Sequence, residues 1–138
     1  MKRLIVLGST GMLGSEVLRV SQEAELDVIP VSRQGQVRFD AETTDFKSFA
    51  ENLNLGSNDW LVNCIGWIPQ KASGDQKHDE KLAYLLNASL PEQISNSQQE
   101  RGFQWIQIGT DCVFSGKRGN YTERDSFDPV DLYGESKV

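Results

Sequence analysis

The chain has 138 residues, which is enough for one domain with a real hydrophobic core. Apolar residues make up 38% of the sequence and charged residues 25%, the usual balance of a soluble globular protein. The net charge is −6 and the sequence has no block of Lys or Arg, which argues against nucleic acid or an anionic membrane surface as the main partner.

The amino-terminal segment predicts a strand followed by a helix. Residues 3–7 predict the strand, since the apolar run from Leu4 to Leu7 stops at a glycine, as expected of a strand buried on both faces. The run is too short for the core of a signal peptide, and no run in the chain approaches the roughly 18 apolar residues of a transmembrane helix. A stripe of four apolar positions at helical spacing then predicts the helix: Leu13, Val17, Val20 and Ala24.

The next segment predicts two strands and a second helix. Residues 27–31 have the composition of a strand, although Pro30 weakens it or places it near the strand end, and residues 36–39 form a shorter one. Thr43 or Thr44 is expected to cap the helix. Its apolar positions recur at i, i+3, i+4 and i+7: Phe46, Phe49, Ala50 and Leu53.

Residues 60–65 predict a fourth strand, and the polar stretch 68–80 is expected to be a loop. A long helix should follow and run to about residue 99. Pro91 lies inside it and is expected to kink or break it, because proline lacks a backbone donor and crowds the preceding turn. The stripe that marks this helix consists of Leu82, Leu86 and Leu90.

The last part of the chain predicts a fifth strand at residues 103–108, an irregular stretch at 109–130 and a helix that starts near Asp131. Strands that alternate with helices indicate an α/β protein of Rossmann type, a doubly wound parallel sheet with helices on both faces. In this architecture ligands bind at the carboxyl ends of the strands, so the residues that follow each strand are the candidates for function.

A glycine-rich loop follows the first strand, with Gly8, Gly11 and Gly14 spaced as G-x-x-G-x-x-G. One glycine permits a tight turn, another lets the backbone approach a pyrophosphate, and the third lets the helix pack on the sheet. A glycine-rich turn without a ligand is the alternative. The position between a buried strand and a helix favours dinucleotide binding.

The residues after the second and third strands bear on the choice of dinucleotide. NAD sites usually place an acidic residue after the second strand, whereas this chain has Ser32 and Arg33 there. A guanidinium can bind a ribose 2′-phosphate through forked hydrogen bonds, so NADPH is favoured over NAD, unless Arg33 is simply a solvated loop charge. Asp40 could accept a hydrogen bond from the adenine amino group or could cap a helix.

Two cysteines, Cys64 and Cys112, lie in apolar stretches. We expect both to be buried, reduced thiols, which is typical of a cytoplasmic protein. The single histidine, His78, lies in a polar segment and is expected to be exposed, and no Cys/His cluster has the spacing of metal ligands.

The chain resembles the extended short-chain dehydrogenase/reductases, and among them the dTDP-4-dehydrorhamnose reductase-like nucleotide-sugar reductases. The resemblance covers nearly the whole chain and rests on four stretches: residues 8–14, 62–66, 109–123 and 128–137. Carried over by position, it implies a catalytic set of Thr110, Tyr133 and Lys137.

The chemistry of ketone reduction needs these residue types. A hydride comes from the nicotinamide, and the developing alkoxide needs a proton, which a tyrosine phenol can donate when an ammonium lies close by. Lys137 is one helical turn from Tyr133, and the hydroxyl of Thr110 could hold the substrate carbonyl beside the phenol. A Tyr–Lys pair alone is a frequent coincidence, so the placement of Thr110 after the fifth strand matters.

The residues after Thr110 narrow the subfamily that the resemblance implies. Related dehydratases carry Thr-Asp-Glu, but this chain has Thr110-Asp111-Cys112, and a cysteine does not readily replace the carboxylate in acid/base chemistry. The reductases have a tyrosine where this chain has Cys112. That departure leaves the identity of the sugar open.

The resemblance also implies which residues line the cofactor. Asn87 matches a helix asparagine that supports the active site in many members, although an ordinary polar helix residue is nearly as good an interpretation. The residues expected to bind the cofactor are Gly8, Thr10, Gly11, Met12, Leu13, Gly14, Ser32, Arg33, Asp40, Ala41, Cys64, Ile65, Gly66, Asn87, Tyr133 and Lys137.

These features predict an NADPH-dependent reductase of a 4-keto nucleotide sugar. The nucleotide sugar is the expected partner, and a homodimer is possible. A non-catalytic cofactor-binding module of the same fold and a nucleotide-sugar epimerase are the alternatives. Members of the resembled family are longer and add a carboxyl-terminal lobe that grips the sugar. We therefore expect residues 1–138 to be the NAD(P)-binding domain of a longer protein, and the fragment alone to be inactive.

Overall fold

The computed structural model describes residues 2–138, and the chain divides into two compact units. The first comprises the residues up to Ile65 together with Leu90–Ile108, and the second comprises Gly66–Ser89 together with Gly109–Val138.

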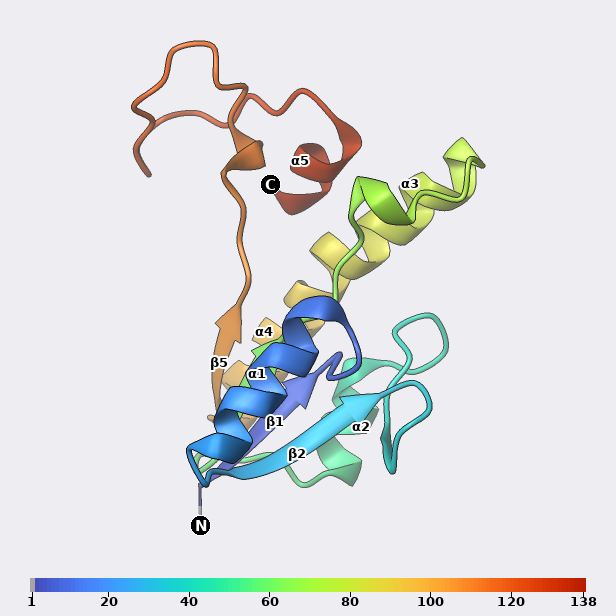
Figure 1. Ribbon diagram of the computed structural model, residues 1–138, viewed down its shortest axis with the longest axis vertical. Coiled ribbons are helices and arrows are strands. Elements are labelled where there is room, and N and C mark those ends of the chain that lie inside the picture. The colour runs from blue at the N-terminus through green and yellow to red at the C-terminus, as the bar shows by residue number, and fades with distance from the viewer. Residues whose placement is uncertain (1) are drawn as a thin grey trace. The chain divides into compact units, whose positions relative to one another are not determined.

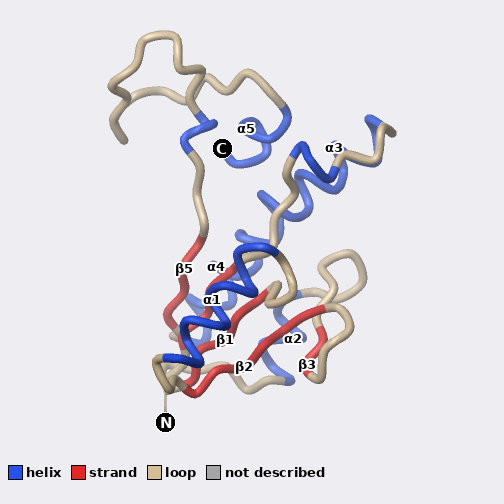
Figure 2. Tube along the Cα trace, in the orientation of Figure 1, coloured by secondary structure: helices blue, strands red, loops and turns tan. Residues whose placement is uncertain are grey.

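The first unit is built on a five-stranded sheet in the order β3-β2-β1-β4-β5. Its strands are drawn in red in Figure 2. Every neighbouring pair of strands is parallel, which confirms the predicted Rossmann-type architecture. The strands are β1 (Arg3–Leu7), β2 (Asp27–Ser32), β3 (Val37–Arg38), β4 (Trp60–Asn63) and β5 (Gln104–Gln107).

Helices cover both faces of this sheet. Figure 1 shows α1 (Met12–Glu23) on one face, with α2 (Phe46–Asn52) and α4 (Leu90–Arg101) on the other. The main hydrophobic core lies under the second face, where Phe39, Phe46 and Phe49 form a cluster with ring centroids 5.0–5.9 Å apart. Aromatic rings at these separations add to the free energy gained from burying their area.

The α1 helix does not bury the predicted apolar stripe. Gly14 and Ser21 are its buried residues, whereas Leu13 and Val20 are 40% and 49% exposed. The reason is that the helix lies very close to the strand end at Gly14. A Cβ on Gly14 would overlap the carbonyl group of Gly8. Small residues therefore face the sheet, and the helix is rotated away from the orientation that its apolar pattern indicates.

The α2 helix has a different cap from the one predicted. Asp45 is the N-cap residue, and its carboxylate accepts a hydrogen bond from the Ser48 N–H at 3.0 Å. The N–H groups of Thr43 and Thr44 donate to the Asp40 carbonyl in the preceding turn. The expectation that Thr43 or Thr44 caps the helix is therefore wrong, and Asp40 does not cap it either.

The second unit begins its helix earlier than the sequence indicated. The α3 helix (Gln76–Tyr84) starts inside the stretch expected to be a loop, and the 3-10 turn η1 (Pro69–Lys71) precedes it. Asp75 caps α3 by accepting from the N–H groups of Lys77 and His78. The polarity of this stretch reflects a capped and exposed first turn, in which His78 is exposed as expected.

Pro91 does not stop the helical conformation. The π-helical segment η2 (Leu85–Ser89) follows α3 directly, and Pro91 is the second residue of α4. A proline is tolerated in the first turn of a helix, where its missing N–H has no intrahelical acceptor. In place of the kink or break expected at Pro91, the hydrogen bonding changes from α-helical to π-helical in the segment before it.

The second unit is completed by the 3-10 turn η3 (Asp111–Val113), an irregular loop and the helix α5 (Leu132–Lys137). The loop is held by Asp128, whose carboxylate accepts from the N–H and hydroxyl of Ser115 at 2.8 and 2.5 Å. Within it the rings of Phe114 and Tyr121 stack, with centroids 4.6 Å apart. The irregular stretch expected at 109–130 is therefore ordered by specific contacts.

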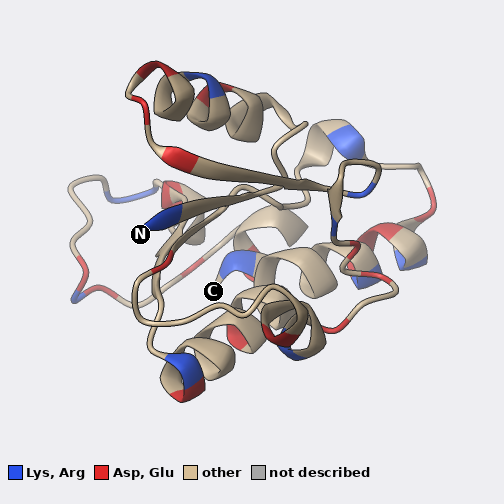
Figure 3. Ribbon diagram, turned by 90° about the horizontal axis from the view of Figure 1, so that it is seen from below, with Lys and Arg blue, Asp and Glu red and all other residues tan. Residues whose placement is uncertain are grey.

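Charges of both signs are interspersed along the ribbon, and acidic residues lie beside basic ones on several helices (Figure 3). On α1, for example, Arg19 pairs with Glu16 and Glu23. Within residues 2–138, none of the helices has the length and apolar character needed to cross a bilayer.

Candidate active site

The carboxyl edge of the sheet brings together the segments that follow three strands. In the strand register Leu7 lies opposite Val31 on one side and Asn63 on the other. The residues after β1, β2 and β4 are therefore neighbours, as the parallel topology predicts. This edge carries most of the residues expected to bind a cofactor.

The glycine loop is shaped by two close approaches. Gly8 has a φ of +85°, and a Cβ there would lie 2.9 Å from Cγ1 of Ile65. The N–H groups of Gly8 and Ser9 both donate to the Val31 carbonyl at 3.0 Å, which ties the loop to β2. Gly14 abuts Gly8 as described above. Glycine is thus required at the first and third positions of the motif.

The loop leaves the amino end of α1 accessible. Gly11 is the N-cap residue and has no side chain with which to cap the first turn, and Met12 is 88% exposed. The first N–H groups of a helix lack intrahelical acceptors, and their partial positive charge attracts anions such as phosphate. Thr10 and Leu13 are exposed beside them. The geometry of this loop therefore fits a dinucleotide pyrophosphate.

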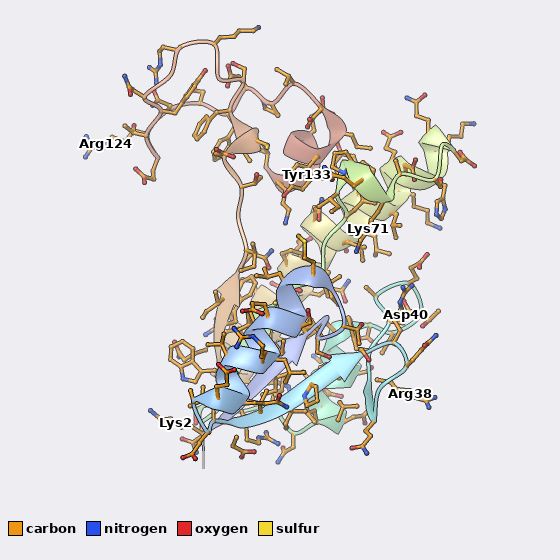
Figure 4. All side chains as sticks on the ribbon, viewed as in Figure 1. Lys2, Arg38, Asp40, Lys71, Arg124 and Tyr133 are labelled. Carbon is orange, nitrogen blue, oxygen red and sulfur yellow. The ribbon has the colours of Figure 1, made fainter. Side chains whose placement is uncertain are left out.

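The residues after β2 and β3 differ in exposure. Ser32 is buried at the end of β2, and Arg33 follows it on the surface. Asp40 is half-buried and accepts a hydrogen bond from the Glu42 N–H at 3.1 Å, while Ala41 packs on the core. Figure 4 shows Asp40 on the loop beside this end of β2.

The segment after β4 is anchored by Asn63, which is fully buried. Its amide donates to the side chain of Gln107 at 2.9 Å, and its oxygen accepts from the N–H of Ile65 at 3.1 Å. Cys64 donates its N–H to the Leu7 carbonyl and is half-buried, and burial raises the pKa of its thiol. This holds residues 64 and 65 beside the glycine loop.

Thr110 and Cys112 belong to the second unit. Thr110 lies three residues beyond the end of β5 and is half-buried. Its hydroxyl oxygen accepts from the Cys112 N–H at 3.2 Å and so caps the turn η3. Both cysteines are free, as expected, but Cys112 is exposed rather than buried, because its apolar neighbours form a surface turn instead of a strand.

Tyr133, labelled in Figure 4, and Lys137 lie one turn apart on α5, and both are half-buried. The ammonium nitrogen of Lys137 is 6.0 Å from the centroid of the Tyr133 ring. Burial lowers the pKa of the Lys137 ammonium, because a cation loses hydration there. A negative charge that formed near it, such as a phenolate, would be stabilised by it.

Asn87 is a structural clamp in this unit rather than an ordinary polar helix residue. It is buried in η2. Its side-chain oxygen accepts a hydrogen bond from the backbone N–H of Trp67, and its side-chain amide donates one to the backbone carbonyl of Trp67, both at 3.0 Å. Gly66 lies against it, since a Cβ there would be 3.2 Å from the Asn87 oxygen and 3.8 Å from the Lys137 nitrogen.

Two residues that matter to this arrangement were missed in the sequence. A Cβ on Gly134 would overlap the carbonyl oxygen of Cys112, so α5 packs directly on η3 at this glycine. Ser136 is 1% exposed and is bonded to Asn87. A glycine and a serine inside a short helix are the only signal the sequence offers for such contacts.

The predicted site residues divide between the two units. The first unit brings together Gly8, Thr10, Gly11, Met12, Leu13, Gly14, Ser32, Arg33, Asp40, Ala41, Cys64 and Ile65. The second brings together Gly66, Asn87, Thr110, Tyr133 and Lys137.

Comparison with known proteins shows what the chain is similar to. The family model described as RmlD substrate binding domain matches residues 1–138. The spore coat polysaccharide biosynthesis protein SpsK of Bacillus subtilis is 30% identical over 139 residues, an alignment that covers 99% of this chain and 46% of SpsK. The chain therefore spans less than half the length of this relative.

Two solved structures share the fold. A hypothetical dTDP-4-dehydrorhamnose reductase from Sulfolobus tokodaii matches with a TM-score of 0.77 and 26% identity, over 99% of this chain and 49% of that one. The dTDP-4-dehydrorhamnose reductase of Bacillus anthracis, solved in complex with NADP, matches with a TM-score of 0.72 and 25% identity, over 99% of this chain and 47% of that one.

Proposed function

Because the chain belongs to the RmlD substrate binding domain family, we propose that it is the amino-terminal, cofactor-binding part of an NADPH-dependent reductase of a 4-keto nucleotide sugar. The complete protein would carry a further lobe that grips the sugar. The matched relatives support this proposal, since the chain covers less than half of their length.

One observation carries the proposal. Tyr133 and Lys137 lie one turn apart on α5, and α5 packs through Gly134 on the turn that Thr110 caps. The three residue types needed for ketone reduction are thus gathered within one unit of the structure. The packing of η3 on α5 supports a functional role for Tyr133 and Lys137 over a coincidental Tyr–Lys spacing.

The residues of the glycine loop fit the cofactor. Gly8 and Gly14 let the loop pack closely on Ile65 and on its own backbone, and the open amino end of α1 offers N–H groups to phosphates. When bound, the dinucleotide supplies the hydride. Arg33, exposed after β2, would bind the ribose 2′-phosphate and give the preference for NADPH over NADH. The NADP complex of the Bacillus anthracis reductase is in keeping with this preference.

In the proposed mechanism Thr110 donates its hydroxyl hydrogen to the substrate carbonyl and holds it near Tyr133. The Tyr133 phenol donates its proton to the oxygen as the carbonyl carbon is reduced to an alcohol. The Lys137 ammonium stabilises the phenolate that remains. Its half-buried position strengthens that attraction, because partial burial reduces the screening of the two charges by water.

The decisive experiment is an NADPH oxidation assay of the complete protein against several 4-keto nucleotide sugars. Tyr133→Phe should lower kcat at least about 100-fold, since the proton donor is lost, and leave the KM for NADPH nearly unchanged. Equal turnover in the parent and in Tyr133→Phe would remove Tyr133 from the mechanism. Binding of NADPH without any turnover would instead favour a non-catalytic module of this fold.

A further inference from the structure

Ser136 lies between the two candidate catalytic residues in sequence but faces away from solvent. It is 1% exposed, in a helix of only six residues. Its hydroxyl donates to the Tyr133 carbonyl at 2.9 Å and accepts from the Asn87 amide, also at 2.9 Å. The second bond joins α5 to a residue 49 positions earlier in the chain.

The orientation of Asn87 in this network has a single solution. The backbone N–H of Trp67 must face the side-chain oxygen of Asn87, and the backbone carbonyl of Trp67 must face the side-chain nitrogen of Asn87. Both N–H groups of the amide are then used, one on Trp67 and the other on Ser136. A flipped amide would set donor against donor, so Asn87 is fixed with its second N–H aimed at α5.

The same clamp passes close to Lys137. A Cβ at Gly66, the residue before Trp67, would lie 3.8 Å from the Lys137 nitrogen and 3.2 Å from the Asn87 oxygen. The ammonium therefore rests over the backbone that Asn87 holds. On another part of α5, Gly134 meets the Cys112 carbonyl. Together these contacts fix both the distance and the rotation of a very short helix.

We propose that Ser136 is a positioning residue, which acts through Asn87 to hold α5 in the rotation that presents Tyr133 and Lys137 to the substrate. This inference rests on the proposed function for its catalytic meaning. A six-residue helix has little stability of its own, so its rotation depends on such tertiary contacts.

The test is a double-mutant cycle in the complete protein, with kcat and KM measured for NADPH-dependent reduction of the keto sugar. Ser136→Ala should lower kcat about tenfold and change the KM for NADPH by less than about twofold. In an Asn87→Ala background the same substitution should have less than about a twofold effect, because its partner is already gone. Ser97→Ala, which changes a buried helical serine of the other unit, serves as control.

Two kinetic results would overturn the inference: a kcat of Ser136→Ala equal to that of the parent, or an equal loss in both backgrounds. A second readout does not depend on turnover. Hydrogen exchange of the Asn87 side-chain amide, followed by NMR, should accelerate at least about tenfold in Ser136→Ala and stay unchanged in Ser97→Ala. Unchanged exchange in Ser136→Ala would contradict the inference, whether or not the parent has reductase activity. Absence of reductase activity in the parent would instead contradict the proposed function.

Discussion

Gly134 packs so closely on Cys112 that a Cβ at position 134 would overlap the Cys112 carbonyl oxygen, and it would also lie 2.8 Å from Cβ of Pro129. The obstacle is backbone on one side and a rigid ring on the other, so neither can move aside cheaply. This contact sets the distance between α5, which carries Tyr133 and Lys137, and the turn that Thr110 caps.

Gly134→Ala is therefore expected to displace α5 and to lower the free energy of unfolding by about 2 kcal/mol, the usual cost of overpacking. Urea denaturation followed by circular dichroism measures this. Gly56→Ala is the matched control, since a Cβ at position 56 meets nothing within 4 Å. Equal stability of the two variants would contradict the close contact.

Gly8→Ala should impair cofactor binding and folding together. Gly8 has a positive φ, and a Cβ there would lie 3.2 Å from the carbonyl carbon of Cys64 as well as against Ile65. The left-handed conformation alone costs a non-glycine residue about 1–2 kcal/mol. Isothermal titration with NADPH and urea denaturation give the two readouts. Tight NADPH binding in a variant as stable as the parent would argue against the proposed role of this loop.

Arg33→Ala should raise the KM for NADPH by about tenfold or more and leave the KM for NADH nearly unchanged, because only the former carries the 2′-phosphate. Arg38→Ala is the control, an exposed arginine nearby whose Nε donates to the Gly35 carbonyl at 3.2 Å. Steady-state kinetics with both cofactors measures the difference. Parallel changes for the two cofactors would assign Arg33 to the solvated surface.

Asp59 should make stability depend on pH. The bidentate hydrogen bonds from Arg3, at 2.8 and 2.6 Å, hold the pKa of the buried Asp59 carboxyl below its ordinary value. Because the folded pKa is depressed, this stabilisation is fully present above the unfolded pKa of about 3.9 and is lost as pH falls through the folded pKa.

Asp59→Asn should therefore destabilise the protein by about 2 kcal/mol at pH 7 and show a flatter decline in stability toward pH 3. Urea denaturation at pH 7, 5 and 3 tests both expectations. A variant whose stability declines as steeply as that of the parent would show that other carboxylates dominate the acid response.

Most of the fold was predictable because strand and helix patterns are local. The strand predicted at residues 3–7 coincides with β1, and the strand predicted at 27–31 differs from β2 by a single residue. The misassigned segment at 68–80 was polar for a local reason as well, since Asp75 caps a helix there. Composition alone cannot separate a capped, solvated first turn from a loop.

The sequence by itself determined the succession of strands and helices of a parallel α/β sheet, the glycine loop and the residue types of a candidate catalytic set. Only the tertiary structure decided how these elements face one another. Gly14 against Gly8 rotates α1 away from its apolar stripe, and Ser136 bonded to Asn87 fixes α5. Periodicity reports on neighbours within a few residues, whereas these contacts depend on close backbone approach and on hydrogen bonds between distant positions.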